Sequence, residues 1–194
     1  MSPIRIPAIT TTEFVGATSL GDGRCRFEVW APHARQVSVE LLAPSPKVVP
    51  LQPAERGYFR AVLNDVPPGA RYFYRLEDGS IRPDPASRFQ PEGVHGPSEV
   101  ISQEFKWTDG SWGGVSIQDF ILYELHVGTY TSEGSFGAVQ QRLEELTDLG
   151  ITAVELMPIG QFPGDRNWGY DGVYPFAVQN SYGGPAALKA LVDA

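Results

Sequence analysis

The hydrophobic pattern of this chain changes its period near Asp119, and that change limits the folds that the chain can adopt. Before Asp119, short segments alternate polar and apolar residues, as in residues 24–30 (RCRFEVW). After it, residues 120–127 and 151–157 are nearly continuous apolar runs of strand length. Alternation is typical of half-buried antiparallel strands, whereas continuous runs are typical of strands covered on both faces in a parallel sheet. The sequence therefore predicts a multidomain chain with two parts of different class.

The first predicted domain, residues 1–106, is an immunoglobulin-like antiparallel β-sandwich. Expected strands at 24–30, 37–41, 58–63 and 72–76 are separated by turn residues rich in Gly and Pro. Several short strands at this spacing are typical of a sandwich. Pro83 and Pro85 lack amide donors, so residues 81–88 should form an ordered loop or a packing arm instead of a ladder. Cys25, the only cysteine, is expected to be a buried small apolar side chain.

The second predicted domain, residues 119–194, follows a linker at 107–118. A helix is expected from Phe136 with apolar residues at spacings of three and four through Leu149, and Gly150 should end it. With the two flanking apolar runs this makes a βαβ unit. A long loop follows from Pro158, and Pro185 opens a further helix. A closed (β/α)8 TIM barrel needs about 250 residues, so we expect two βα units of an incomplete barrel, with the remainder in a longer chain.

Composition excludes several classes of protein. Apolar residues make up 42% and charged residues 20% of the chain, as in an ordinary soluble globular protein. The net charge of −8 arises from 23 acidic and 15 basic side chains without a basic cluster, so nucleic acid is not an expected partner. The sequence has no targeting segment and no apolar run of roughly 18 residues, which argues against a membrane partner and for a cytoplasmic protein. No metal site and no cofactor are expected.

Four segments resemble the first two βα units of an α-amylase-class barrel: 123–131 (YELHVGTYT), 150–159 (GITAVELMPI), 168–173 (WGYDGV) and 182–185 (YGGP). Residues 27–32 (FEVWAP) resemble the amino-terminal module of glucan branching and debranching enzymes. Within that class the chain most resembles the malto-oligosyltrehalose trehalohydrolases. The specific marks are residues 83–98 (PDPASRFQPEGVHGPS) and the pairing of HVGT at 126–129 with WGYDG at 168–172.

The resemblance implies hydrolysis of the α-1,4 bond next to the terminal trehalose unit of maltooligosyl trehalose. The implied mechanism is retaining and uses two carboxyl groups about 5–5.5 Å apart. In the family these carboxyl groups follow later strands, so no catalytic residue is assigned in this chain, which is expected to be inactive alone. The expected partner is maltooligosyl trehalose or a related α-glucan. Two alternatives remain: a fragment of a glycogen branching or debranching enzyme, and a non-catalytic glucan-binding module.

Five residues are candidates for substrate binding. The resemblance implies that Tyr170 stacks on a sugar ring, whose C–H groups suit an aromatic face. Asp171 would orient an arginine or bond the sugar, or it is simply a turn residue. Trp168 and Asn167 line the same pocket or serve packing. His126 would lie near the carboxyl end of its strand and donate to a hydroxyl, unless it is a satisfied core histidine.

Four further residues receive structural interpretations. Glu124 and Glu155 are expected to be charges inside or below a barrel, paired with basic residues from later strands, and not catalytic. Asp165 is most simply a turn residue. Trp30 is expected to point into the sandwich core and not to serve as an exposed sugar platform.

Overall fold

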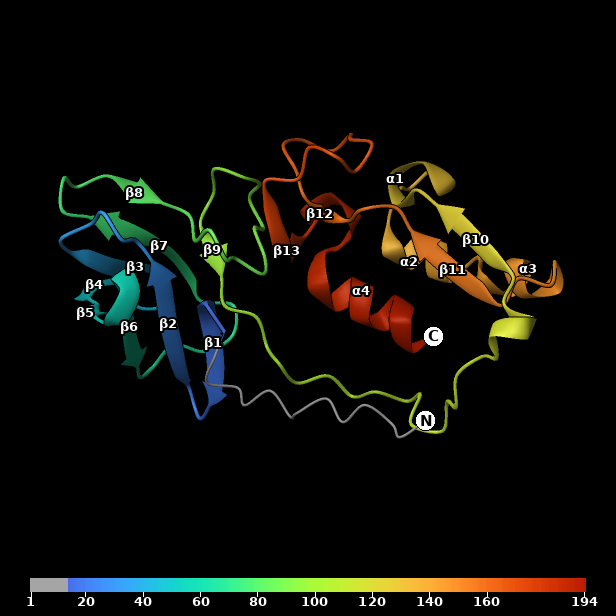
Figure 1. Cartoon of the computed structure of the whole chain (residues 1–194), viewed down its shortest axis with the longest axis horizontal. Helices are drawn as coiled ribbons and strands as arrows, with labels where there is room; N and C mark the ends of the chain where they lie inside the picture. Colours follow the sequence, from blue (N-terminus) through green and yellow to red (C-terminus); the bar gives the residue numbers. More distant parts are fainter. Residues whose placement is uncertain (1–13) are drawn as a thin grey trace.

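The computed structural model describes residues 14–194. The beginning of the predicted domain 1–106 and the prediction about targeting at the amino terminus therefore lie outside the described residues. Two regions lie side by side in Figure 1, one built almost entirely of strands and one that mixes short strands with helices. An extended connection at residues 101–116 joins them. None of the helices within the described residues has the length and apolar character needed to cross a membrane.

The first region is a β-sandwich of two antiparallel sheets, as the alternating pattern predicts. One sheet has the order β1 (Gly16–Gly21), β2 (Arg24–Trp30), β6 (Tyr58–Leu63) and β5 (Gln52–Pro53). The other has the order β4 (Lys47–Pro50), β3 (Val37–Ala43), β7 (Arg71–Leu76) and β8 (Ile81–Arg82), with β9 (Ser98–Glu99) also on β7. A short 3-10 turn, η1 (Glu55–Gly57), precedes β6.

The core of the sandwich forms between the two sheets. Cys25, Phe27 and Val29 alternate along β2 and are buried, and the ring of Phe27 meets Tyr72 of the opposite sheet edge-on at 4.9 Å. Cys25 is buried as predicted, and burial raises the pKa of its thiol to about 12. A thiol held protonated in this way is a packing group and not a nucleophile.

Trp30 is not in the core, and the prediction that placed it there was wrong. Its side chain is 59% exposed, and its indole N–H donates to the carbonyl of Arg56 at 3.0 Å. The period of two explains this, because Trp30 shares its face of β2 with Arg26 and Glu28, whose side chains form an ion pair at 2.8 Å. The strand directs its odd-numbered residues inward, so aromatic character did not decide the direction of the ring.

The segment after β8 is a packing arm, as its prolines indicate. Asp84 is fully buried and accepts hydrogen bonds from the hydroxyl of Tyr72 at 2.5 Å and the amide of Ala86 at 2.8 Å. Burial raises the pKa of the Asp84 carboxyl to about 6, although these hydrogen bonds oppose the rise. Further along the arm, the Arg88 guanidinium donates to the carbonyls of Ala17 and Val15 at the edge strand β1. The arm thereby fills one side of the sandwich.

The second region begins with η2 (Ile117–Asp119) and β10 (Leu122–Leu125). The elements that follow are α1 (Val127–Tyr130), α2 (Phe136–Gln140), α3 (Leu143–Asp148), β11 (Ala153–Leu156), β12 (Gly160–Gln161), β13 (Tyr174–Val178), η3 (Asn180–Tyr182) and α4 (Gly184–Asp193). Strands β10 and β11 pair in parallel, with Leu122 opposite Ala153. Leu122 is nevertheless 49% exposed, so the covering that the apolar run predicts is not supplied by residues 14–194.

The helix predicted from Phe136 to Leu149 is divided into α2 and α3. Arg142 lies between them with φ −107° and ψ 3°, outside the helical range. The Ser135 side chain caps α2 by accepting from the amide of Ala138, and Gly150, at φ +92°, follows the end of α3 as expected. Leu149, the C-cap residue of α3, is 71% exposed and is not part of the apolar face.

Hydrogen bonds at α4 and at β13 tie the second region to the connecting segment and to the arm of the first region. Both the amide and the hydroxyl of Thr108 donate to the carboxylate of Asp193, at 2.6 and 2.9 Å. At β13, the Tyr174 hydroxyl donates to the carbonyl of Val94 at 2.9 Å. The connecting segment runs along α4 in Figure 1. The sandwich and the second region are thus held in a defined relation.

Candidate functional site

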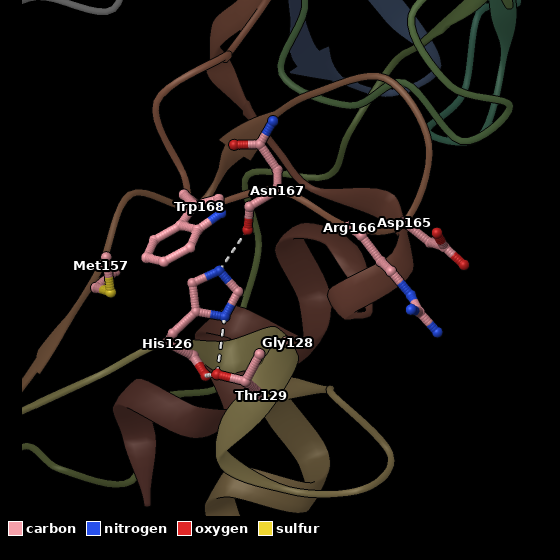
Figure 2. A pocket seen from close by; sticks show the side chains of 8 residues that line it. All are labelled: His126, Gly128, Thr129, Met157, Asp165, Arg166, Asn167 and Trp168. Atoms are coloured by element: carbon pink, nitrogen blue, oxygen red, sulfur yellow. Dashed lines mark hydrogen bonds between the residues drawn. The ribbon is translucent and has the colours of Figure 1, made fainter.

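A candidate pocket lies beyond the carboxyl ends of β10 and β11. It has a volume of about 590 Å³ and is lined by His126, Gly128, Thr129, Met157, Asp165, Arg166, Asn167 and Trp168. Small-molecule sites usually measure about 300–1,000 Å³, so this one is large enough for a sugar unit. Figure 2 shows Trp168 and Met157 on one side of His126, with Asp165 and Arg166 on the other. Ligand sites of parallel α/β folds occur at this end of the strands.

His126 lies directly after β10 and begins α1 as its N-cap residue. Its Nε2 lies 2.5 Å from the carbonyl of Asn167, and its Nδ1 lies 3.3 Å from the hydroxyl of Thr129. Because a carbonyl only accepts, Nε2 carries a proton and donates to Asn167, while Nδ1 contacts the hydroxyl of Thr129. Both ring nitrogens are therefore used inside the protein (Figure 2). His126 fastens the loop of Asn167 to the end of β10.

Asn167 organises the loop that carries the predicted site residues. Its Oδ1 accepts from the amides of Gly169 at 2.6 Å and Asp171 at 3.4 Å, and its Nδ2 donates to the Asp171 carboxylate at 3.0 Å. These bonds close a tight turn around the side chain. Gly169 has φ +99°, and a Cβ there would lie 2.9 Å from the carbonyl of Pro158, so the turn requires glycine. Asn167 and Asp171 thus form one local unit.

Gly128 permits close packing beneath the pocket. A Cβ at this position would lie 3.0 Å from the hydroxyl of Tyr182 and 3.1 Å from the ring of His126. Tyr182 is buried, with its ring against Phe136 and Phe162, and burial raises the pKa of its hydroxyl. The absence of a side chain at Gly128 lets Tyr182 support the pocket from below.

The structure brings together three of the five predicted site residues. His126, Asn167 and Trp168 line the pocket, whereas Tyr170 and Asp171 do not. Tyr170 is 73% exposed and Trp168 is 80% exposed, so both rings present free faces on the same loop. The lining residues Gly128, Thr129, Met157 and Arg166 were missed, and Asp165 was taken for a turn residue. Their signal in the sequence was position, since Met157 directly follows β11, and Gly128 and Thr129 lie in α1 just after β10.

Carboxylate chemistry is incomplete in this pocket. Of its lining residues only Asp165 carries a carboxyl group, whereas glycoside hydrolysis needs two. Glu124 and Glu155 lie opposite each other in the register of β10 and β11, and both are exposed and outside the pocket. Within residues 14–194, no three His, Cys, Asp or Glu side chains are grouped to hold a metal ion. The pocket as described therefore has no pair of carboxyl groups that could act as acid and nucleophile.

Comparison with known proteins relates both regions to glucan enzymes. Residues 15–90 match the family model of carbohydrate-binding module 48, the isoamylase N-terminal domain. A malto-oligosyltrehalose trehalohydrolase of Saccharolobus solfataricus is 51% identical over 86% of this chain and 29% of its own length. A second one, from Deinococcus radiodurans, is 43% identical over 93% of this chain and 30% of its own length.

The chain is homologous to the malto-oligosyltrehalose trehalohydrolases. These trehalohydrolases are α-amylase-family glycoside hydrolases, and the match covers only their amino-terminal part. The chain spans about 30% of the length of the curated trehalohydrolases that it matches.

Two solved structures also align with most of this chain. A crystal structure from Salmonella typhimurium, described as an alpha amylase, aligns with a TM-score of 0.87 and 38% identity, over 92% of this chain and 30% of that chain. A pullulanase from Anoxybacillus sp. LM18-11, complexed with maltotetraose, aligns with a TM-score of 0.73 and 23% identity, over 92% of this chain and 32% of that chain. At that identity the pullulanase shows the fold alone.

Proposed function

We propose that this chain is the amino-terminal part of a malto-oligosyltrehalose trehalohydrolase. In this proposal residues 1–106 are the immunoglobulin-like module, 107–118 the linker, and 119–194 the first two βα units of the catalytic (β/α)8 barrel. The observation that carries the proposal is the 51% identity over 86% of this chain. The parallel pair β10 and β11 supports the barrel, because parallel neighbours joined through helices are its building unit.

The proposed reaction is release of trehalose from maltooligosyl trehalose by a retaining mechanism with two carboxyl groups. The pocket at β10 and β11 would bind a sugar next to the scissile bond, and the catalytic carboxyl groups would come from strands beyond this chain. Trp168 and Tyr170 are proposed as aromatic platforms for sugar rings, because both rings are exposed on the loop above the pocket. Asn167, Asp171 and His126 would hold that loop in place through the hydrogen bonds described above.

A direct assay compares the 194-residue chain with the complete protein that contains it. Trehalose release from maltooligosyl trehalose by the complete protein only is the expected result, since the chain has no carboxylate pair in its pocket. New α-1,6 branches or linearised chains as products would replace the proposal with a branching or debranching enzyme. Glucan binding without any product would leave a non-catalytic glucan-binding module.

The role of the platforms is tested in the same complete protein. Trp168→Ala and Tyr170→Ala should each lower kcat/KM by about two- to tenfold, because an aromatic contact contributes about 0.5–1.5 kcal/mol. Trp112→Ala is the matched control, since Trp112 is 73% exposed but lies in the connecting segment outside the pocket. An equal loss in all three variants would contradict a specific role of the loop.

A further inference from the structure

The loop that forms one wall of the pocket, residues 162–168, is fastened by polar side chains that do not line the pocket. These are Gln161 at the end of β12, Gln179 directly after β13, and Asn180 at the start of η3. Gln161 and Gln179 are both completely buried. A buried amide is costly unless its donors and acceptors are bonded, so their partners decide what these side chains do.

Gln179 bonds the wall loop at two successive points. Its Oε1 accepts from the amide of Phe162 at 2.9 Å, and its Nε2 lies 3.0 Å from the carbonyl of Gly164 as donor. The same Nε2 lies within donating distance of the Asn180 side-chain oxygen at 3.2 Å and the Ser181 hydroxyl at 2.8 Å. One side chain therefore fixes the backbone just before Asp165, where the lining residues begin.

Gln161 completes the network from the other strand. Its Oε1 accepts from the amide of Asn180 at 3.0 Å, and its Nε2 donates to the carbonyl of Phe162 at 3.0 Å and the side-chain oxygen of Asn180 at 3.1 Å. Phe162 is consequently bonded through both its N–H and its C=O to glutamine side chains. The backbone at Phe162 cannot shift without leaving at least one buried amide group unpaired.

Polar networks of this kind specify one conformation more than they add stability. Apolar side chains of similar volume would fill the same space, but they would leave the buried amides of Phe162 and Asn180 without the acceptors that the glutamines supply. Two wholly buried glutamines at the base of one pocket wall are thus placed to define the position of that wall. A preformed wall matters for a sugar site, because small displacements of the groups that bind the substrate lower the reaction rate strongly.

We infer that Gln161 and Gln179 are positioning residues that hold residues 162–168 in the geometry that binds the sugar. They touch no ligand themselves and act through the backbone of Phe162 and Gly164. The inference rests on the proposed function, because it assigns the wall loop to glucan binding. Substrate affinity is therefore expected to respond to these residues more than the chemical step does.

The test uses Gln179→Met in the complete protein, since methionine keeps the approximate volume and removes all four contacts of the amide. We expect the KM for maltooligosyl trehalose to rise on the order of tenfold, with kcat changed much less. Amide hydrogen exchange in residues 162–168 should become faster, because the Phe162 amide loses its acceptor. Gln140→Met, an exposed glutamine on α2, is the matched control and should change neither quantity.

A second variant separates positioning from packing. Gln179→Glu keeps an acceptor for Phe162 but loses the donor to Gly164 while the carboxyl group is ionised. Burial should raise the pKa of that new carboxyl group, and the protonated form again carries an O–H donor. The KM defect of this variant relative to the wild type should therefore shrink as the pH falls, which loss of packing alone would not produce. If Gln179→Met does not fold, as judged by circular dichroism, Gln161→Met replaces it.

The outcomes distinguish the inference from the proposed function. An active wild type together with a Gln179→Met variant whose KM stays within about twofold would overturn the inference and leave the proposed function intact. Unchanged hydrogen exchange in the wall loop would overturn it as well. A complete wild-type protein without activity on maltooligosyl trehalose would remove the proposed function, and the inference with it.

Discussion

The sandwich and the second region solve the burial of apolar surface differently. In the sandwich the two sheets cover each other, so Phe27 and Val39 have no exposed surface. In the second region the parallel pair carries equally apolar residues, yet Ile121 and Leu122 remain about half exposed. The sandwich buries its apolar strand residues between its own two sheets, whereas the strand pair leaves part of its apolar surface exposed within residues 14–194. The difference teaches that an apolar run shows that a segment favours burial, but it does not show whether other parts of the chain cover that segment.

The largest effect that tests this comparison is expected in the sandwich core. Phe27→Ala should lower the free energy of unfolding by about 3–5 kcal/mol, because it removes a fully buried ring and leaves a cavity beside Tyr72. Leu122→Ala should cost less than about 1 kcal/mol in the same 194-residue chain, since half of that side chain is already exposed. Urea denaturation followed by circular dichroism measures both. Similar losses would erase the distinction between the regions.

The buried Asp84 carboxyl predicts a pH dependence confined to the sandwich. Its pKa of about 6 exceeds the ordinary value of 3.8, so the folded chain binds this proton more tightly than the unfolded chain does. Its contribution to stability is therefore fully present below about pH 3.8 and is lost as the pH rises through about 6. The stability difference between the wild type and Asp84→Asn should shift by about 2–3 kcal/mol between about pH 4 and pH 7, in favour of the wild type at the acid end.

Thermal denaturation of both proteins at several pH values measures that shift, and the subtraction cancels the titration of all other groups. Asp78→Asn serves as a control, because Asp78 is exposed and its pKa is lowered by hydrogen bonds from Ser80. A difference between the wild type and Asp84→Asn that does not change with pH would contradict the assigned cause.

The exposed side chain of Leu122 on β10 allows the 194-residue chain to be compared with the complete protein. In the 194-residue chain, Leu122→Lys should change the free energy of unfolding by no more than about 0.5 kcal/mol. In the complete protein the same change should cost about 2–3 kcal/mol, because further barrel strands and helices would bury Leu122. Denaturation of both lengths side by side decides the matter. Equal effects would mean that this face stays open in the complete protein.

The smallest effect is expected at the exposed tryptophan of β2. Trp30→Ala should lower the free energy of unfolding by about 1 kcal/mol or less, because the ring is mostly exposed and makes one hydrogen bond, to Arg56. Phe59, the buried neighbour across the strand pair from Val29, is the contrasting position, and Phe59→Ala should cost several-fold more. A loss above about 2 kcal/mol for Trp30→Ala would restore the core role that aromatic character first indicated.

The site was predicted in part, and the misses have a physical reason. His126, Asn167 and Trp168 were found because they lie near strand ends or in the long loop. The hydrogen bond from His126 to the Asn167 carbonyl joins residues 41 positions apart, and the sequence carries no sign of it. The glutamine network was also missed. In the sequence Gln161 and Gln179 resemble ordinary surface residues, and only the fold shows that both are buried, at β12 and directly after β13.

The sequence by itself determined the antiparallel sandwich, the parallel pair of strands after Asp119 and the burial of Cys25, because alternation, apolar runs and Gly or Pro positions act over a few residues. Only the tertiary structure decided that Trp30 faces outward, that the helix after Phe136 breaks at Arg142, and that Leu122 stays exposed. Burial depends on which surface approaches a segment from elsewhere in the chain. Local periodicity shows which face of a segment is apolar, but the segment that covers this face is brought there only by the folding of the whole molecule.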